Sequence, residues 1–312
     1  MSQFVTHPTV VLGVPALNEA KFIWKTLDSI QRQTHADFAV LISDNGSTDD
    51  TAAICERFAA EDPRFHFFRQ PNNIGSSNNF NFLRKSTDSP FFAWVGGHDM
   101  LHPDYLRNHL AALNAAPQIG ASFTFWDFID ETDALLRRGC DVGTATPQWG
   151  PFLRYLWSAA LAIDLGPMHG VYRRSCICDL PMRNCPACDH ILLSNCFYLA
   201  PFKCIPGHLY KLREFDESKR SQNVMQRITG KSSAVLDMQS AIDGYLEDFD
   251  KIVPPDSWHR HMKPLVKWAL QDRFVRQRFQ ATKLIRSTLK RSHEFKRLCM
   301  NLNFSARNQP DS

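Results

Sequence analysis

The alternation of apolar and polar positions divides the first 130 residues into short strands and amphipathic helices. Each unit opens with a short run of apolar or β-branched residues and continues with apolar residues at helical spacing. The predicted strands cover residues 9–15, 38–43, 64–69, 91–95 and 121–129. Strands that alternate with helices build right-handed βαβ units. The pattern therefore predicts an α/β fold with a mostly parallel sheet flanked by helices.

The stretch FFAWVGGHDMLHPD, residues 91–104, combines a buried strand with residues that can carry chemistry. Its apolar run ends in two glycines, which are followed by His98 and Asp99. Ligands of open α/β sheets bind beyond the carboxyl ends of the strands, so this carboxylate and imidazole are well placed for a phosphate-bound metal. In the alternative interpretation the segment is a turn, and Asp99 only caps the following helix.

Polar, turn-forming residues also follow the second strand. This strand ends near Asp44, and Asn45-Gly46-Ser47 comes next. A carboxylate at this edge can accept hydrogen bonds from a base imide or a ribose hydroxyl, and the turn lets the chain bend around a ligand. The first strand is not followed by G-x-G-x-x-G, and the sequence contains no G-x-x-x-x-G-K-[ST]. Dinucleotide-binding and P-loop sites are therefore not indicated.

Four motifs in order, VPALNE, SDNGSTDDT, NNIGSSNNF and VGGHD, resemble the nucleotide-sugar-binding half of a family 2 glycosyltransferase of the GT-A fold. The resemblance is strong over residues 8–130 and looser over 131–215. It implies a Rossmann-like GT-A domain that moves a sugar, with inversion, from a nucleotide sugar to a glycan, lipid-linked or surface-polysaccharide acceptor. A UDP-sugar is the expected donor, with dTDP- and GDP-sugars as alternatives. A role in polysaccharide biosynthesis follows from this.

The same resemblance implies which residues bind the donor and the metal. Asp44 would hold the base. The other nucleotide- and donor-binding residues that it implies are Pro15, Asn18, Glu19, Asn73, Gly75, Asn79, Gly97, His98 and Arg213. Asp99 corresponds to the last carboxylate of the family's metal-binding D-x-D motif, although Gly97 replaces the first aspartate. A divalent cation, Mn²⁺ or Mg²⁺, is expected at Asp99, with His98, the diphosphate and water completing its coordination.

An inverting transferase also needs a general base, which takes the proton of the acceptor hydroxyl as that hydroxyl attacks the anomeric carbon. The metal would stabilise the leaving diphosphate. In the family this base lies at a helix start after the metal motif. Asp189 occupies the matching position here, after a strand-like stretch at 168–173. In the alternative interpretation Asp189 is the N-cap of its helix and has no catalytic role.

Cysteines close to Asp189 point to a different kind of site. The pattern C-x-C…C-x-x-C, which four thiolates of a tetrahedral zinc site could produce, is formed by Cys176, Cys178, Cys185 and Cys188. Paired zinc ligands usually have two to four residues between them, so the one-residue gap is unfavourable. The alternative is buried, reduced cysteines. The chain has 9 cysteines and no visible secretory signal, which is typical of reduced thiols in a cytosolic protein.

Charge is distributed unevenly along the chain. Residues 251–300 contain 13 Lys and Arg against 3 Asp and Glu, a net charge of +10, whereas residues 1–250 sum to −6. The pattern over 258–298 is typical of a basic amphipathic helix, which either contacts an anionic membrane or packs its apolar stripe on the protein. No recognisable motif indicates a nucleic-acid partner. Without an apolar run of about 18 residues, the expected location is the cytoplasm or, peripherally, the inner face of the membrane.

The expected organisation is a catalytic domain followed by a helical extension. The divisions are a GT-A domain at 1–215, with a nucleotide-sugar-binding half at 1–130 and an acceptor half at 131–215, a basic helical extension at 216–300 and a disordered tail at 301–312. An apolar stretch at 146–165 predicts a helix that lies either beside the acceptor cleft or in the core. The alternative function is a non-catalytic nucleotide-sugar-binding protein with a weakened metal site.

Overall fold

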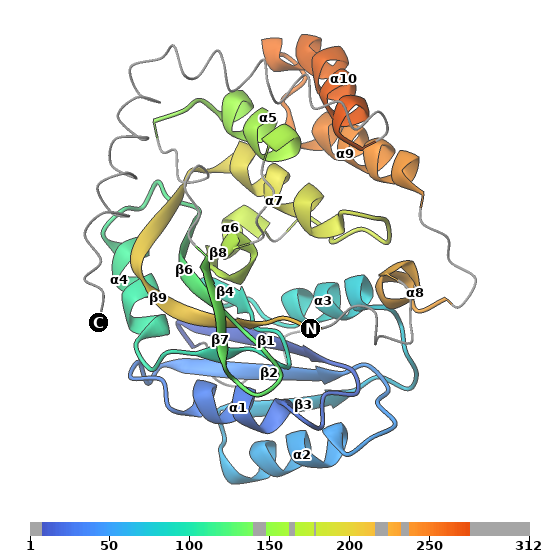
Figure 1. The fold of residues 1–312 in the computed structure, drawn as a ribbon. Coiled ribbons are helices and arrows are strands. Elements are labelled where there is room, and N and C mark those ends of the chain that lie inside the picture. Colours follow the sequence, from blue (N-terminus) through green and yellow to red (C-terminus); the bar gives the residue numbers. More distant parts are fainter. Residues whose placement is uncertain are drawn as a thin grey trace.

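The computed structural model describes residues 8–139, 148–161, 166–177, 179–215, 224–231 and 237–274. In this part of the chain a nine-stranded sheet has helices on both faces (Figure 1). The strands are β1 (Val10–Ala16), β2 (Phe38–Asp44), β3 (Phe65–Arg69), β4 (Phe91–Trp94), β5 (Met100–Leu101), β6 (Ala121–Ile129), β7 (Leu135–Gly139), β8 (Val171–Arg173) and β9 (Phe202–Arg213).

The helices cover both faces of this sheet and continue beyond it. They are α1 (Ile23–Gln31), α2 (Thr51–Glu61), α3 (Ser76–Lys85), α4 (Tyr105–Asn114), α5 (Pro151–Leu161), α6 (Arg174–Ile177), α7 (Cys188–Leu199), α8 (Val224–Thr229), α9 (Met238–Ile252) and α10 (Lys263–Phe274). The 3₁₀-helices η1 (Gly166–His169) and η3 (Trp258–Met262) precede β8 and α10, respectively.

The first half of the sheet is parallel, as predicted. β1 lies between β2 and β4, β3 forms the edge, and all of these pairings are parallel. The five predicted strands agree with β1, β2, β3, β4 and β6 to within one residue at each end. The second half is mixed, because β8 is antiparallel to β4 and β6 whereas β6 and β9 are parallel. The prediction of an α/β fold with helices on both faces is confirmed.

The stretch 168–173 departs from its predicted strand, because β8 begins only at Val171 and η1 precedes it. Pro167 favours the 3₁₀ turn, since its ring fixes φ and it has no N–H to donate to a strand ladder. Its carbonyl oxygen accepts a hydrogen bond from the Tyr172 hydroxyl at 2.6 Å. Local proline geometry therefore overrides the apolar pattern of this stretch.

Apolar side chains fill both faces of the sheet. On one face α1, α2 and α4 pack against the strands, and on the other α3, α6 and α7 do so. Strand β4, predicted as a buried strand, is buried along its whole length. This is the burial expected of a strand covered by helices on both sides.

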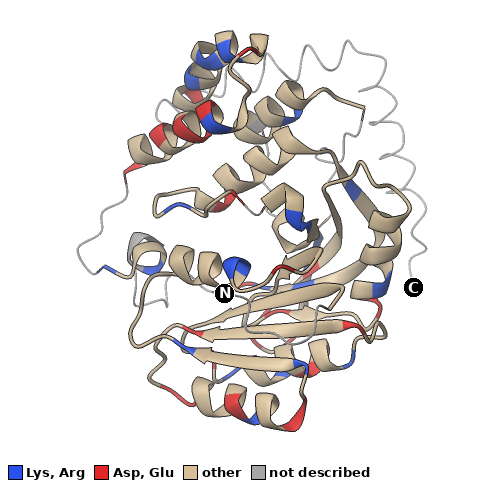
Figure 2. Cartoon of the chain, turned by 180° about the vertical axis from the view of Figure 1, so that it is seen from behind, with Lys and Arg blue, Asp and Glu red and all other residues tan. Residues whose placement is uncertain are grey.

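The carboxyl-terminal helices share a third apolar core with α5 and α7. Tyr245 and Phe249 of α9 and Leu270 of α10 pack there with Tyr155 of α5. Helix α5 forms within the apolar stretch 146–165, as predicted. The two helices differ in charge: α9 contains mainly Asp and Glu, whereas α10 contains mainly Lys and Arg (Figure 2).

The predicted basic helix at 258–298 is described only up to residue 274, and that part packs its apolar positions on the protein. Residues 275–298 and the predicted tail at 301–312 lie outside the described residues. Trp258, at the start of η3, is 62% exposed. Among the described helices, none is long and apolar enough to cross a membrane.

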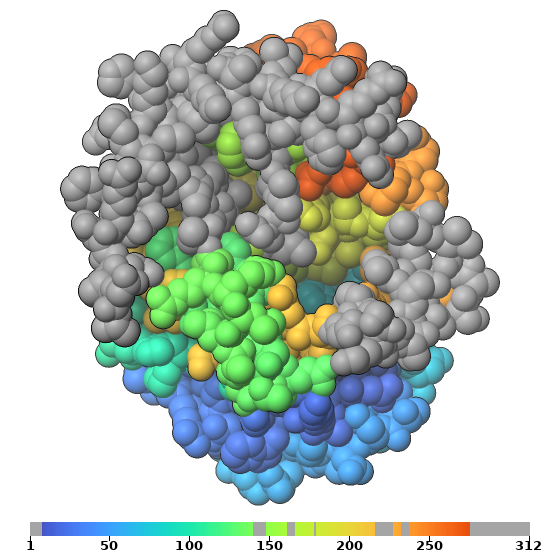
Figure 3. Space-filling model, viewed as in Figure 1, coloured from blue at the N-terminus to red at the C-terminus, as the bar shows by residue number. Residues whose placement is uncertain are grey.

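The hairpin of β6 and β7 lies on the surface above the amino-terminal half of the chain (Figure 3). Its two leucines, Leu135 and Leu136, are each 52% exposed. Two lysines contact its turn: Nζ of Lys21, just before α1, lies 2.6 Å from Glu131 Oε2, and Lys25 of α1 pairs with Asp133. The hairpin is thereby tied to the helix that follows β1.

Candidate active site

The carboxyl ends of β1, β2 and β4 meet at one edge of the sheet, and three loops continue from them. The register pairs Ala16 of β1 with Asp44 of β2. Directly beyond, the Asn45 N–H donates to the Ala16 carbonyl at 2.8 Å. Glu19 in the first loop meets His98 in the loop after β4, with 2.8 Å between Oε1 and Nδ1. The structure therefore gathers residues from three separate sequence motifs.

The loop after β1 is bonded to the loop after β2. Asn18 has a φ of 55°, in the left-handed region that asparagine tolerates better than most residues. Its Oδ1 accepts a hydrogen bond from the Thr48 N–H at 2.9 Å, and its own N–H donates to Ser47 Oγ at 2.8 Å. Asn18 thus orders the turn that follows Asp44.

Asp44 is completely buried, and only one of its two oxygens accepts a hydrogen bond in the described part of the chain. Oδ1 accepts from the Ser47 N–H at 3.1 Å. Oδ2 has no hydrogen-bond partner among the described residues and lies 3.4 Å from Arg69 Nε. A buried acceptor without a donor costs about 1–3 kcal/mol, so this position favours a ligand that donates to it.

Arg69 is a candidate site residue that the sequence analysis misses. It ends β3, where the register pairs it with Asp44. Its side chain is 53% exposed, and its Nη2 donates to the Ser47 carbonyl at 3.1 Å. The rule that selects Asp44, a polar residue at the carboxyl end of a parallel strand, also selects Arg69.

The loop before α3 is held by asparagine side chains, one of them from the loop after β2. Asn73 Oδ1 accepts from Asn45 Nδ2 at 3.0 Å and from the Gly75 N–H at 2.9 Å. Gly75 has a φ of 87°, and a Cβ there would lie 2.5 Å from the Ile228 carbonyl oxygen at the end of α8. Only glycine fits this conformation and this close contact.

Asn79 lies deeper than the sequence analysis expects. It is 1% exposed and bonds Ser43 twice, accepting from Oγ at 2.5 Å and donating to the carbonyl at 3.0 Å. These bonds hold α3 against the end of β2. Among the predicted donor-binding residues, Asn79 is therefore placed to support the loops.

Asp99 joins the loop after β4 to β9. It is 1% exposed. Its Oδ2 accepts from the Tyr210 hydroxyl at 2.8 Å and its Oδ1 from the Arg213 N–H at 2.9 Å. A Cβ at Gly96 would lie 2.5 Å from Asp99 Oδ2, so the glycine is needed for this packing.

Asp99 offers a divalent cation a single protein carboxylate. Such a cation takes six or more oxygen ligands, usually from several side chains and water. Both Asp99 oxygens already accept hydrogen bonds, and His98 Nε2 is 4.0 Å from Oδ1. In the described part of the chain no three His, Cys, Asp or Glu side chains are grouped so that they could hold a metal. The diphosphate of the donor and water would therefore have to supply most of the ligands of the cation expected at Asp99.

Arg213 is buried beneath the His98 loop. Its side chain is fully buried, and its Nε donates to the His98 carbonyl at 2.9 Å. Its Nη2 lies 2.5 Å from Asp133 Oδ1, and its Nη1 donates to the Asp130 carbonyl. A diphosphate would reach this guanidinium only by displacing these contacts, so Arg213 acts here as a support for the loop.

Asp189 lies in the first turn of α7 and is partly buried. The N-cap of α7 is Ala187, with a φ of 55°, and the helix has no side-chain cap at that position. The alternative that Asp189 is the N-cap is therefore wrong. Its Oδ1 accepts a hydrogen bond from the His190 N–H at 2.8 Å.

His169 connects the surroundings of Asp99 and Asp189. Burial lowers the pKa of His169, whereas the negative charges of Asp99 and Asp189 both act in the opposite direction. The centre of its ring is 4.6 Å from that of Tyr210, which donates to Asp99. Asp99 and Asp189 thus both lie close enough to influence the same imidazole.

The cysteines near Asp189 do not form a metal cluster in the described residues. Cys176 Sγ lies 3.7 Å from the Cys196 carbonyl, and Cys188 Sγ lies 3.7 Å from Ser77 Oγ. Burial raises the pKa of the Cys188 thiol to about 12, which keeps it protonated. Cys178 lies outside the described residues. These contacts agree with buried, reduced cysteines.

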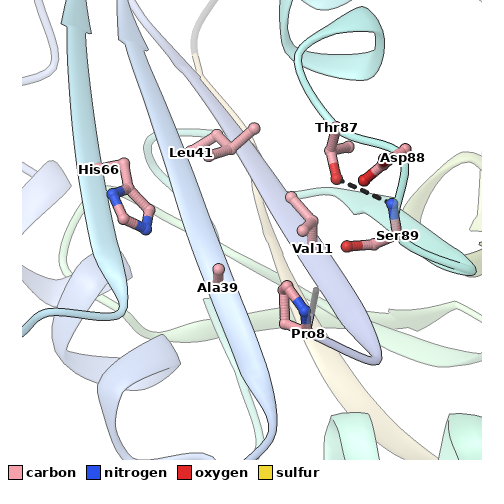
Figure 4. A pocket seen from close by; sticks show the side chains of 8 residues that line it. All are labelled: Pro8, Val11, Ala39, Leu41, His66, Thr87, Asp88 and Ser89. Carbon is pink, nitrogen blue, oxygen red and sulfur yellow. Dashed lines mark hydrogen bonds between the residues drawn. The ribbon is translucent and has the colours of Figure 1, made fainter. Parts of the chain in front are cut away.

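A small hollow lies at the other end of the parallel strands (Figure 4). It is lined by Pro8, Val11, Ala39, Leu41, His66, Thr87, Asp88 and Ser89. Val11 and Ala39 stand near the amino ends of β1 and β2, whereas Asp44 ends β2. The hollow is therefore separate from the candidate active site.

Comparison with known proteins identifies related sequences. The family model described as "Glycosyl transferase family 2" matches residues 12–177. Chondroitin synthase of Escherichia coli is 42% identical over 133 residues, which are 42% of this chain and 19% of that protein. Hyaluronan synthase of Pasteurella multocida is 30% identical over 97 residues, 31% of this chain and 10% of that protein. The chain thus matches only a minor part of these longer relatives.

Solved structures share the fold at low sequence identity. Residues 1–349 of Staphylococcus aureus TarS, in complex with UDP-GlcNAc, match with a TM-score of 0.64 and 18% identity over 94% of this chain and 79% of that one. The mannosyltransferase PcManGT of Pyrobaculum calidifontis, in complex with GDP-Man and Mn²⁺, matches with a TM-score of 0.50 and 16% identity over 98% of this chain and 82% of that one. These similarities show the GT-A fold.

Replacing Asp99 by asparagine should destabilise the protein. Tyr210 and Arg213 donate to different oxygens of Asp99, and one of these becomes an NH₂ donor in the amide, so the two hydrogen bonds cannot both persist. The expected loss in the free energy of unfolding is about 1–3 kcal/mol, measured by urea denaturation. Asp256→Asn, at an exposed position, is the control and should change little. Unchanged stability with lost nucleotide binding would instead favour Asp99 as a ligand of the donor or its metal.

Proposed function

Because this chain belongs to glycosyl transferase family 2, we propose that it moves a sugar, with inversion, from a nucleotide-sugar donor to a glycan acceptor. The observation that carries the proposal is the buried Asp44 carboxylate beside Arg69 at the carboxyl edge of the sheet. This is the edge at which open α/β sheets bind nucleotides.

The pairing of Asp44 with Arg69 suits a base with an imide edge. Uracil presents an N–H between two carbonyl oxygens. Asp44 Oδ2 would accept from that N–H, and the exposed guanidinium of Arg69 would donate to a neighbouring carbonyl. TarS was solved with UDP-GlcNAc and PcManGT with GDP-Man, so we favour a UDP-sugar and keep dTDP- and GDP-sugars as alternatives.

The rest of the donor would lie along the loops after β1 and β4 and before α3. The proposed donor-binding residues there are Pro15, near the end of β1, and Asn18, Glu19, Asn73, Gly75, Gly97 and His98 in the loops. Asn79 bonds the end of β2, and Arg213 bonds the loop after β4. The relatives named chondroitin synthase and hyaluronan synthase favour a glycan or surface-polysaccharide acceptor, with a lipid-linked acceptor as the alternative. A role in polysaccharide biosynthesis is part of this proposal.

Asp189 is the proposed general base. It would take the proton of the acceptor hydroxyl while that oxygen attacks the anomeric carbon and the nucleoside diphosphate leaves. PcManGT was solved with Mn²⁺, which supports a divalent cation here as well. Asp99 would hold this Mn²⁺ or Mg²⁺ together with the diphosphate and water, and the cation would stabilise the leaving diphosphate.

Replacing Asp44 by alanine should weaken UDP binding. A charged hydrogen bond to the base contributes about 1.5–3 kcal/mol, so the dissociation constant should rise roughly 10- to 150-fold. Calorimetry with UDP measures this, and Arg69→Gln should weaken binding as well. The control is Asp256→Ala, far from the strand ends in sequence and exposed. Unchanged UDP affinity in both site variants would place the base elsewhere.

Replacing Asp189 by asparagine should slow sugar transfer without weakening the binding of the donor. Loss of a general base typically costs roughly a hundred- to ten-thousandfold in rate. The UDP dissociation constant and the melting temperature should stay close to those of the wild type, since Asn keeps an oxygen for the His190 N–H. Asp243→Asn, exposed on α9, is the control. A normal rate in a stable variant would remove Asp189 from the mechanism.

Measuring the release of UDP tests the proposed function itself. The wild type should release UDP from a UDP-sugar, either by transfer to an added glycan or by slow hydrolysis. The replacement of the D-x-D aspartate by Gly97 favours one other candidate, a non-catalytic nucleotide-sugar-binding protein. Tight UDP-sugar binding with no release of UDP under any acceptor would support that second candidate.

A further inference from the structure

The segment that leads into Asp189 is bonded to the helix that begins at the donor loop. Asn81 of α3 bonds Met182 twice, donating to its carbonyl at 2.7 Å and accepting from its N–H at 2.8 Å. Ser77 Oγ donates to the Arg183 carbonyl at 2.9 Å. The backbone before α7 is therefore attached to α3, whose first residue follows Gly75.

The side chain of Arg183 turns to the opposite neighbour, helix α9. Its Nη2 lies 2.6 Å from Asp248 Oδ1, and its Nη1 lies 2.8 Å from Glu247 Oε2. A Cβ at Gly244 would already be 3.0 Å from Arg183 Cδ, so the glycine permits this approach. One residue thus connects α3 through its backbone and α9 through its guanidinium.

Asp248 also reaches the helix that carries Asp189. Its side chain is 2% exposed, and its Oδ2 accepts from Asn195 Nδ2 of α7 at 2.9 Å. One buried carboxylate therefore bonds both the segment before α7 and the body of α7. Asp189 lies between these two attachment points in the sequence.

We propose that Asp248 is a positioning residue, which sets the place of Asp189 relative to the donor through Arg183 and Asn195. The inference rests on the proposed role of Asp189 as general base. In-line attack requires the base, acceptor and anomeric carbon to be held in one geometry, and a misplacement of about 1 Å can cost about a hundredfold in rate. The helical extension is then part of the catalytic unit.

A purely structural role predicts something different. Buried ion pairs add little net stability compared with apolar residues of similar size, whereas breaking one partner is strongly destabilising. If Arg183 and Asp248 only stabilise the fold, a variant with apolar residues at both positions should have the stability and the activity of the wild type. If they position Asp189, this double variant should have the stability of the wild type but a lower rate of transfer.

The test uses the full chain with Arg183→Met/Asp248→Leu and, as a milder change, Arg183→Lys. Lysine keeps the charge but cannot contact Asp248 and Glu247 with a planar fork. We expect kcat to fall at least tenfold in the double variant and less in Arg183→Lys. The UDP dissociation constant, measured by calorimetry, should stay within threefold of the wild type. Glu247→Gln, at a carboxylate that is 62% exposed, is the matched control and should keep the wild-type kcat.

Asp189→Asn is then made in both backgrounds. If Asp248 acts through Asp189, this change should cost a large factor in the wild type and much less in the double variant, because the two effects are not additive. Full kcat in a stable double variant would overturn the proposal, as would additive losses. Loss of UDP affinity in parallel with kcat would also overturn it. A wild-type rate for Asp189→Asn alone would overturn the base assignment and this inference with it, while UDP binding would still support the donor site.

Discussion

At the candidate site, hydrogen bonds to a buried carboxylate connect the parallel half of the sheet to the mixed half. Asp99 follows β4 in the parallel half and accepts hydrogen bonds from Tyr210 and Arg213 of β9 in the mixed half. Leaving any of these buried groups without its partner would cost about 1–3 kcal/mol. Arg213 in turn donates to the His98 carbonyl, so the position of the loop that contacts Glu19 depends on the same group of hydrogen bonds.

The proposed donor site and the proposed base come from different parts of the protein. The parallel half supplies the loops of the proposed donor site, and its strand order alone places Asp44 next to Arg69. The proposed base comes from α7, outside the sheet, and needs other means to hold it at a fixed place. The bonds of Arg183 to α3 and α9 provide such means. The donor and the acceptor must be aligned for in-line attack, and the elements proposed to act on them are held in place by different contacts.

How well the sequence predicts the structure follows from where each contact originates. The parallel strands were predictable because strands covered on both faces have continuous apolar runs. β5, of 2 residues, is too short to show a pattern, and β8 forms only the last 3 residues of the strand-like stretch at 168–173. Asp44 was predictable from strand order, and Arg69 could have been found by the same rule. The burial of Asp99 was not, because its partners Tyr210 and Arg213 lie 111 and 114 residues further along the chain.

The replacement of the first D-x-D aspartate by Gly97 is linked to the residues that surround it in other loops. A Cβ at Gly97 would lie 3.1 Å from the Pro15 carbonyl oxygen and 3.2 Å from Glu19 Cγ. An aspartate there would place a second carboxylate beside Glu19, and like charges at that distance disfavour each other's ionised forms. Glu19 is also engaged with His98, at 2.8 Å. Restoring the motif would therefore require the loop after β1 to move as well, so the glycine, the histidine and the glutamate form one arrangement.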